Sequence, residues 1–320
     1  MKFLKTEIVK KKMTNASSLC VILGATVQTN STILYEHNYR NFVIGISIIN
    51  GLLSPVAVVA NVFILFSLWK TFSLHSVSNI LVASLAMADL CVGLLLQPML
   101  VYLMNTRLVA TFCVVFEIQM FLAYLFTALS LGTLTYLNIE RAVAIHWPLR
   151  YHELVTSKRR ASVVFQLWVF QILISLIIWF AVGRYSILAI LSVAGALCCT
   201  LVICYSYKTI WKIIRRHQRQ IQTEQPINQE QNAFDLLKYK AKTFTSLMVL
   251  KLFVLCYLPY LCVELKKLTR RGHKSIYVVE YSVLVTIVFA NSSLNPLIYF
   301  WRIKDLRRAA LSTLRSLIIC

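Results

Sequence analysis

Residues 291–314 read NSSLNPLIYFWRIKDLRRAALSTL, which places two Asn, two Ser and a Pro within the first six residues. In a soluble protein these residues would predict a surface turn. They follow the apolar segment SIYVVEYSVLVTIVFA of residues 275–290, however, and apolar residues resume after Pro296 until the chain becomes basic. The pattern therefore predicts a polar cluster inside an apolar helix that ends at a basic boundary.

The composition shows which solvent surrounds that helix. The chain has 320 residues, of which 58% are hydrophobic and 14% are charged. This is too apolar for a soluble domain, whose surface must be covered by polar side chains. A helix needs about 20 apolar residues to cross the hydrocarbon core of a bilayer. Segments of at least that length run over about 42–69, 78–103, 112–139, 161–207, 243–265 and 276–301.

The fourth of these segments, 161–207, is long enough for two crossings. We expect it to fold back at residues 183–186, which begin with Gly183. The predicted fold class is therefore an all-α membrane protein, namely a seven-transmembrane helix bundle, with a short amphipathic eighth helix. The polar segment 217–235 is predicted to be the longest internal loop.

The basic residues predict how the bundle is oriented. A net charge of +21 would suggest nucleic-acid binding in a soluble protein, but in a membrane protein the Lys and Arg distribution sets orientation, and no nucleic-acid partner is expected. That distribution places the N-terminus outside the plasma membrane. We predict an extracellular N-terminal tail (1–41), a seven-transmembrane domain (42–301), and a cytoplasmic amphipathic helix and tail (302–320). Glycosylation sequons at Asn15 and Asn30 agree with this orientation.

The last segment, 302–320, has a pattern typical of an interfacial helix. Leu306, Ala310 and Leu314 follow one another at a spacing of four, and the segment also carries five basic residues, Arg302, Lys304, Arg307, Arg308 and Arg315. Such a helix lies in the plane of the membrane interface. Cys320 is then a candidate for palmitoylation, the alternative being a free terminal Cys.

Polar residues inside the predicted spans are candidate functional residues, because burial of a polar group in lipid is costly. Asn61, Asp89, Ser130, Asn291 and Asn295 come from four different helices. A carboxylate with hydroxyl and amide oxygens suits a small hard cation, or these groups share a water. The alternative is that each of them simply bonds a neighbouring helix.

Four motifs occur in order along the chain: SLAMADL at 84–90, SLGTLTYLNIERAVAIHWPLRY at 130–151, CYLPY at 256–260 and NSSLNPLIY at 291–299. Together they resemble the rhodopsin-like (class A) family of G-protein-coupled receptors. The resemblance covers nearly the whole chain. It implies a receptor that binds an extracellular ligand and activates a heterotrimeric G protein, with arrestin as a second partner and no enzyme activity.

The resemblance also implies residue roles. It assigns activation and G-protein coupling to Glu140, Arg141, Tyr207, Phe253, Tyr257, Pro259, Asn295, Pro296 and Tyr299. It implies an allosteric sodium ion, and no other cofactor, at Asp89, Ser130, Asn291 and Asn295. In the family the Asn-Pro pair unwinds the seventh helix locally, and Pro296 leaves a carbonyl free for another partner. Glu140 is expected to hold the Arg141 guanidinium in the resting state.

Three departures from the family pattern leave alternatives open. Ala142 follows Arg141 where Tyr is commoner, and Tyr257 replaces the usual Trp. Tyr239, between two Lys, stands where many relatives have an acid that restrains this Arg, so we expect raised basal signalling. Two alternatives remain. One is a receptor-like protein that does not couple to a G protein, and the other is a seven-helix ion transporter that uses Asp89.

The ligand is predicted least sharply. Amine receptors carry an Asp at the position of Ala123, so a peptide or a lipid is favoured over an amine. Opsins carry a retinal-bearing Lys at the position of Phe289, so light sensing through retinal is not expected. The candidate ligand-binding residues are Glu117, Phe121, Tyr124, Glu264 and Glu280. The alternative for the acids is pairing with nearby Lys and Arg. The very short connection before the fifth helix is similar to the melanocortin branch of the family. It holds no Cys to pair with Cys113, so pairing with Cys20 stays open.

Overall fold

The computed structural model describes residues 26–28, 37–70, 79–106, 109–147, 150–151, 153, 155–180, 184–221, 226–269, 275–302 and 307–308. Seven of its helical segments are long and apolar enough to cross a membrane. The predicted seven-helix bundle is therefore confirmed.

The first helix is α2 (His37–Lys70). The second span is continuous but has three parts, α3 (Asn79–Cys91), the π-helical η3 (Val92–Leu96) and α4 (Gln97–Asn105). The others are α5 (Val109–His146), α7 (Ser157–Phe180), α8 (Arg184–Ile221), α9 (Pro226–Thr269) and α10 (Val278–Arg302). Two short strands, β1 (Thr26–Gln28) and β2 (Ser275–Tyr277), pair in parallel with Val27 opposite Ile276, which the sequence analysis did not predict.

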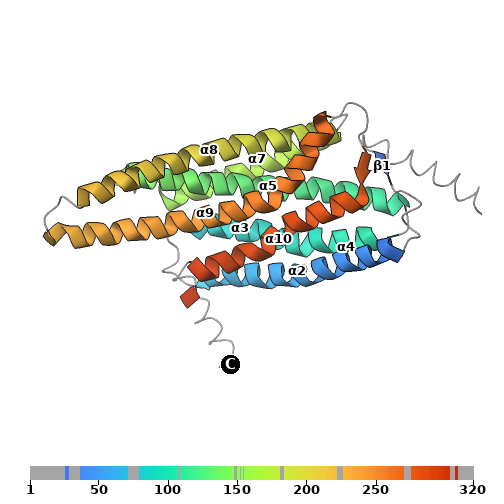
Figure 1. Cartoon of the computed structure of the whole chain (residues 1–320), viewed down its shortest axis with the longest axis horizontal. Helices are drawn as coiled ribbons and strands as arrows, with labels where there is room; N and C mark the ends of the chain where they lie inside the picture. The colour runs from blue at the N-terminus through green and yellow to red at the C-terminus, as the bar shows by residue number, and fades with distance from the viewer. Residues whose placement is uncertain are drawn as a thin grey trace, which may run out of the picture.

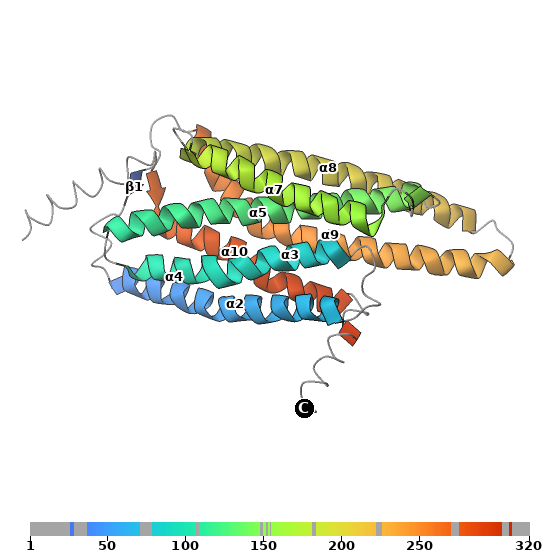
Figure 2. The ribbon, with the colours of Figure 1, turned by 180° about the vertical axis from the view of Figure 1, so that it is seen from behind.

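The helices lie side by side along the long axis of the molecule (Figure 1). The view from behind shows α2 beside α3 and α4, and α7 beside α5 and α8 (Figure 2). In both views α8 and α9 extend past the other helices at the end opposite β1. This projecting end is the one that the positive-inside rule assigns to the cytoplasm.

Two predicted connections are corrected by the structure. Residues 184–186 of the turn expected at 183–186 are helical, since α7 ends at Phe180 and α8 begins at Arg184. Residues 217–235, expected to form a loop, are helical over much of their length, since α8 continues to Ile221 and α9 starts at Pro226. The physical reason is that Gln, Glu and Arg form helices well in water, and Pro is favourable at the first helical position.

The buried core falls into two main clusters along the bundle. The one nearer β1 includes Leu96, Phe116 and Phe289, and the one nearer the projecting end includes Ile64 and Leu134. The expected eighth helix lies largely outside the described residues. Of residues 302–320 the structure describes Arg302, which ends α10, and residues 307–308, which are helical and exposed.

Gly93, in the π-helical segment η3, marks a close approach between the first two spans. A Cβ atom on Gly93 would lie 2.9 Å from Ala57 Cβ and 3.2 Å from the backbone nitrogen of Val58. The Ser54 hydroxyl also donates to the Gly93 carbonyl over 2.9 Å. The close packing of η3 on α2 therefore requires the absence of a side chain at position 93.

Substitution of Gly93 by Val is expected to destabilise the receptor by about 1–3 kcal/mol, because the added atoms force α2 and η3 apart. The measurement is the apparent melting temperature of purified receptor in detergent. Gly51→Val is the matched control, since a Cβ atom on Gly51 meets no atom within 4 Å. Equal melting temperatures for the two variants would contradict the close packing described here.

Candidate functional site

The residues named for a cation lie together in the middle of the bundle. Asp89, Ser130 and Asn291 line a small cavity between α3, α5 and α10. These three and Asn295 are all buried. The Asn295 side-chain amide donates to Asp89 Oδ2 over 2.9 Å. The structure therefore brings the four residues close to one another.

The Asp89 cavity has the size and the donor atoms for one small guest. Its volume is about 20 Å³, and a water needs roughly 10–15 Å³. The side-chain carbonyl oxygens of Asn291 and Asn295 are buried and accept no hydrogen bond from the described residues. A carboxylate, a hydroxyl and unused carbonyl oxygens are ligands that hard cations prefer. The residues present therefore fit a sodium ion as well as a water.

Asn61 has a structural role instead. Its side-chain amide donates to the Ala57 carbonyl over 2.8 Å and to the Ser292 carbonyl over 3.1 Å. Ser292 lies four residues before Pro296, so its carbonyl is the one that loses its helical donor to the proline. Asn61 thus replaces that missing donor and ties α2 to α10. The implied unwinding is not seen, since α10 is helical through Pro296.

Two aromatic residues of α9 close the Asp89 cavity on another side. Phe253 and Tyr257 line the cavity and are buried, and their ring centroids lie 5.5 Å apart. They are one helical turn apart, so both face the same neighbours. Tyr257 also stacks on Tyr260 at 5.5 Å, and the half-buried Pro259 lies between them in sequence. A shift of α9 would therefore change the cavity.

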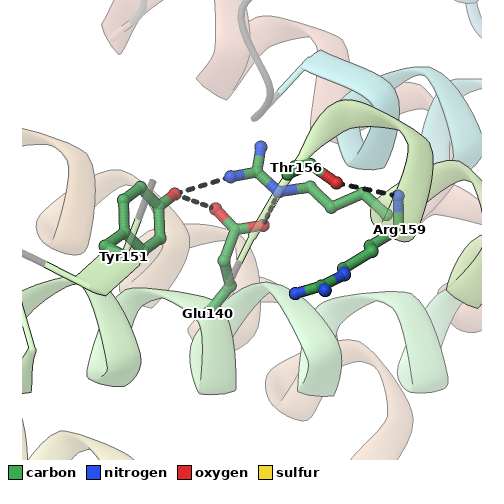
Figure 3. A network of polar contacts seen from close by, with 5 residues as sticks. Glu140, Tyr151, Thr156 and Arg159 are labelled. Carbon is green, nitrogen blue, oxygen red and sulfur yellow. Dashed lines mark hydrogen bonds and ion pairs between the residues drawn. The ribbon is translucent and has the colours of Figure 1, made fainter. Parts of the chain in front are cut away.

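A buried polar network fixes the C-terminal end of α5 (Figure 3). Glu140 Oε2 lies 3.1 Å from Arg160 Nε, and both side chains are almost fully excluded from solvent. The Tyr151 hydroxyl donates to Glu140 Oε1 over 2.9 Å and accepts from Arg160 Nη2 over 2.7 Å. Glu140 thus links α5 to the connection before α7 and to the first turn of α7 itself.

Tyr151 remains a hydrogen-bond donor over the whole physiological range. Burial and the adjacent Glu140 carboxylate, partly offset by Arg160, raise the pKa of Tyr151 to about 12. The neutral hydroxyl therefore persists well above neutral pH. Its proton is directed to Glu140, and its lone pair accepts from Arg160.

The sequence alone does not single out Arg160 or Tyr151. Its basic residues serve there only to predict the orientation, and Arg141 is the partner expected for Glu140. The signal available was weak: Arg160 is the last of three basic residues, Lys158–Arg160, directly before an apolar run. Only the packing of α7 on α5 distinguishes it from its exposed neighbour Arg159.

Arg141 directly follows Glu140 of this network, and Tyr207 and Tyr299 are the two tyrosines to which the family resemblance assigns roles in activation. Arg141 is largely buried and close enough to Tyr207 on α8 for an electrostatic interaction. Tyr207 also lies beside Ser246 of α9. Tyr299 is buried in the core cluster that contains Phe253, and its hydroxyl has no hydrogen-bond partner among the described residues. The two tyrosines thus have different neighbours in this conformation.

Ala142, the departure that follows Arg141, packs against two residues of α8. Its methyl group contacts the small cluster formed by Ile210 and Ile214. A larger side chain at this position would have to displace those residues, so the alanine is consistent with the close packing of α5 on α8.

The candidate ligand-binding residues are distributed over two sides of the bundle. Phe121 packs edge-to-face on Trp179 of α7 at 5.0 Å, and Tyr124 hydrogen-bonds Gln171 of the same helix. On the other side, Glu264 is buried close to Tyr281 of α10. Glu117 and Glu280 are half-buried on α5 and in the first turn of α10.

Several predictions concern residues that the structure does not describe. Asn15, Asn30 and Cys320 lie outside the described residues, as do the side chains of Cys113 and Tyr239. Glycosylation, palmitoylation and the role of Tyr239 therefore stay predictions.

Comparison with known proteins agrees with this arrangement. A family model described as 7 transmembrane receptor (rhodopsin family) matches residues 60–299. Melanocortin receptor 5 of Mus musculus is 22% identical, over 96% of both chains. Adenosine receptor A2a of Canis lupus familiaris is 24% identical over 82% of this chain and 70% of its own length, and histamine H2 receptor of Cavia porcellus is 27% identical over 85% and 80%.

The fold and the buried polar site define a membrane receptor built from seven helices. The chain belongs to the rhodopsin family of seven-transmembrane receptors. It is a multi-pass membrane protein and a G-protein-coupled receptor with similarity to melanocortin receptors. Receptors of this family are generally not enzymes and generally need no cofactor. The comparisons thus favour the receptor over the ion transporter that the sequence left open.

Proposed function

We propose that the receptor lies in the plasma membrane with residues 1–41 outside and 302–320 inside, and activates a heterotrimeric G protein through Arg141. Glycosylation at Asn15 and Asn30 and palmitoylation at Cys320 belong to this proposal, as does arrestin as a second cytoplasmic partner. The observation that carries it is the position of Arg141, near Tyr207 of α8 and beside a Glu140 that Arg160 and Tyr151 already engage.

The Asp89 cavity is proposed as a sodium site that favours the resting state. Asp89, Ser130 and Asn291, which line the cavity, would hold the ion, and Asn295 would take part through its hydrogen bond to Asp89. Phe253 and Tyr257 form part of the same wall, so movement of α9 and loss of the ion are coupled.

The ligand is proposed to be a peptide or a lipid. Similarity to melanocortin receptor 5 over nearly the full length supports this, and so does Ala123, which offers no carboxylate to an amine. Of the candidate residues, Glu117 and Glu280 are half-buried at the outer ends of their helices. They would receive basic groups of a peptide.

Nucleotide exchange by a purified G protein, with the receptor in nanodiscs, tests this function. We expect the receptor to accelerate exchange without ligand, and replacement of sodium chloride by choline chloride to raise the rate further. Asp89→Asn is expected to remove most of the sodium dependence, whereas Asn50→Ala, a buried amide that bonds Thr286 elsewhere in the bundle, should keep it.

The two parts of the proposal fail separately. Exchange no faster than with G protein alone, with correctly folded receptor, would contradict the expected basal activity and leave either a receptor that needs its ligand or a receptor-like protein that does not couple. A sodium effect that persists undiminished in Asp89→Asn would exclude the cation site while leaving the coupling intact.

A further inference from the structure

A second cavity, the lateral cavity, lies between α5, α7 and α8. Its volume is about 200 Å³, whereas a cavity of about 150 Å³ already holds a benzene ring. Phe170 and Leu191 line it and are 62% and 37% exposed. Phe170 belongs to a membrane-spanning segment, so its exposed surface faces lipid. The cavity is therefore open toward the bilayer.

Two glycines on facing helices create much of this space. Gly132 of α5 and Gly195 of α8 both line the cavity, and a Cβ atom at either position would meet no atom within 4 Å. The nearby wall is apolar and includes Leu129, Leu131 and Leu167. A hydrocarbon chain is complementary to such a wall, because it makes dispersion contacts that the wall of an empty cavity lacks and needs no polar partner.

Polar groups lie at one end of the cavity. On α5, Tyr124 lies about two turns before Gly132, and Thr127 lies more than one turn before it. Gln171 comes from the facing α7. Tyr124 hydrogen-bonds Gln171, whose amide donates to the Ser175 hydroxyl over 3.2 Å. None of the residues that line the cavity is charged. A neutral head group therefore fits better than a carboxylate or an ammonium, whose burial without a counter-charge is costly.

The cavity also adjoins the Asp89 cavity. Thr127 and Tyr257 line both of them. A guest in the lateral cavity would therefore contact the same aromatic residue that closes the cation site. This shared wall gives a direct route from occupancy of the lateral cavity to the position of α9.

We propose that the cavity between α5, α7 and α8 binds a neutral single-chain lipid from the bilayer. Its hydroxyl-bearing head group bonds Thr127 and Gln171, and its chain lies along Gly132 and Gly195. Bound lipid regulates the receptor through Tyr257. The regulatory part rests on the proposed function, whereas the binding itself does not.

Photolabelling tests the binding directly. The purified receptor is placed in phosphatidylcholine nanodiscs with a photoreactive monoacylglycerol that carries a diazirine in its acyl chain, and labelled peptides are identified by mass spectrometry. We expect labels on the segments that line the cavity, and loss of these labels with unlabelled monoacylglycerol. Gly195→Leu should lower them to the competed level. Gly51→Leu is the control, since Gly51 is an exposed glycine of α2 whose Cβ would also meet no atom within 4 Å.

The contribution of the head group is tested by a nearly isosteric change. Thr127→Val removes one hydroxyl and should raise the concentration of monoacylglycerol needed for competition by about five-fold, as expected for one hydrogen bond. It also serves in place of Gly195→Leu if that variant does not fold, as judged by its melting temperature.

Equal labelling of the native receptor and Gly195→Leu, spread over the lipid-facing side of every helix, would show ordinary surrounding lipid and overturn the proposal. Competition by a free fatty acid as strong as that by the monoacylglycerol would overturn the neutral head group. Nucleotide exchange is measured on the same samples. Specific labelling without any exchange would count against the proposed coupling and not against the lipid site.

Discussion

Replacement of Arg160 by leucine is expected to destabilise the folded receptor by about 3–5 kcal/mol, which is the usual effect of removing one partner from a buried ion pair. The Arg160 side chain is fully buried, and Glu140 is exposed by only 1%. Without Arg160, the Glu140 carboxylate would keep the Tyr151 hydroxyl as a donor but lose its buried cation. The loss of stability comes from this uncompensated charge.

The measurement is the apparent melting temperature of the purified receptor, with surface expression as a second readout. Arg159→Leu is the matched control, because Arg159 is the adjacent arginine of α7 and is exposed. Exposed charges contribute about 0–1 kcal/mol, so this variant should melt close to the native receptor. Similar melting temperatures for the two leucine variants would mean that the buried network contributes little.

A double-mutant cycle separates the ion pair from simple loss of packing. Glu140→Gln alone leaves the buried Arg160 guanidinium without its counter-charge, and we expect a loss similar to that of Arg160→Leu. In the double variant neither charge remains. Its loss should therefore be much smaller than the sum of the two single losses. Additive losses would show that the two side chains stabilise the receptor independently.

The arrangement of the helices could be predicted because it depends on features that are local in the sequence. The length of apolar segments sets the number of spans, and the motif order places Asp89, Asn291 and Asn295 on helices that are neighbours in the family. The Asn295–Asp89 hydrogen bond is the result. The free Ser292 carbonyl could also be predicted, because a proline leaves the carbonyl four residues before it without a helical donor. Its partner Asn61 could not be predicted.

The rest depends on how each helix is rotated and how its connections fold. Glu140 and Arg160 meet because the segment between them brings α7 onto α5, and no local pattern encodes that contact. Phe121 faces Trp179 of α7, where the sequence suggested a ligand pocket. The lateral cavity likewise requires two glycines, Gly132 and Gly195, to face one another across two helices.

Replacement of Arg141 by alanine is expected to reduce receptor-dependent nucleotide exchange to the level of G protein alone. The physical reason is that Arg141 is the cation placed between α5 and Tyr207 of α8 at the end of the bundle assigned to the cytoplasm. Loss of its guanidinium removes a planar group able to donate several hydrogen bonds to a bound partner. Stability should change little by comparison with Arg160→Leu, because the Glu140–Arg160 pair stays intact.

Nucleotide exchange is measured at matched amounts of folded receptor for Arg141→Ala and for Arg159→Ala. Arg159 is an exposed arginine at the same end of the bundle. We expect Arg159→Ala to keep most of the activity. If Arg141→Ala activated the G protein as well as the native chain, coupling would not pass through Arg141. If both alanine variants lost activity equally, the basic surface as a whole would matter more than this one position. The large difference we expect between them follows from burial, since Arg141 is held among α5 and α8 residues while Arg159 is exposed.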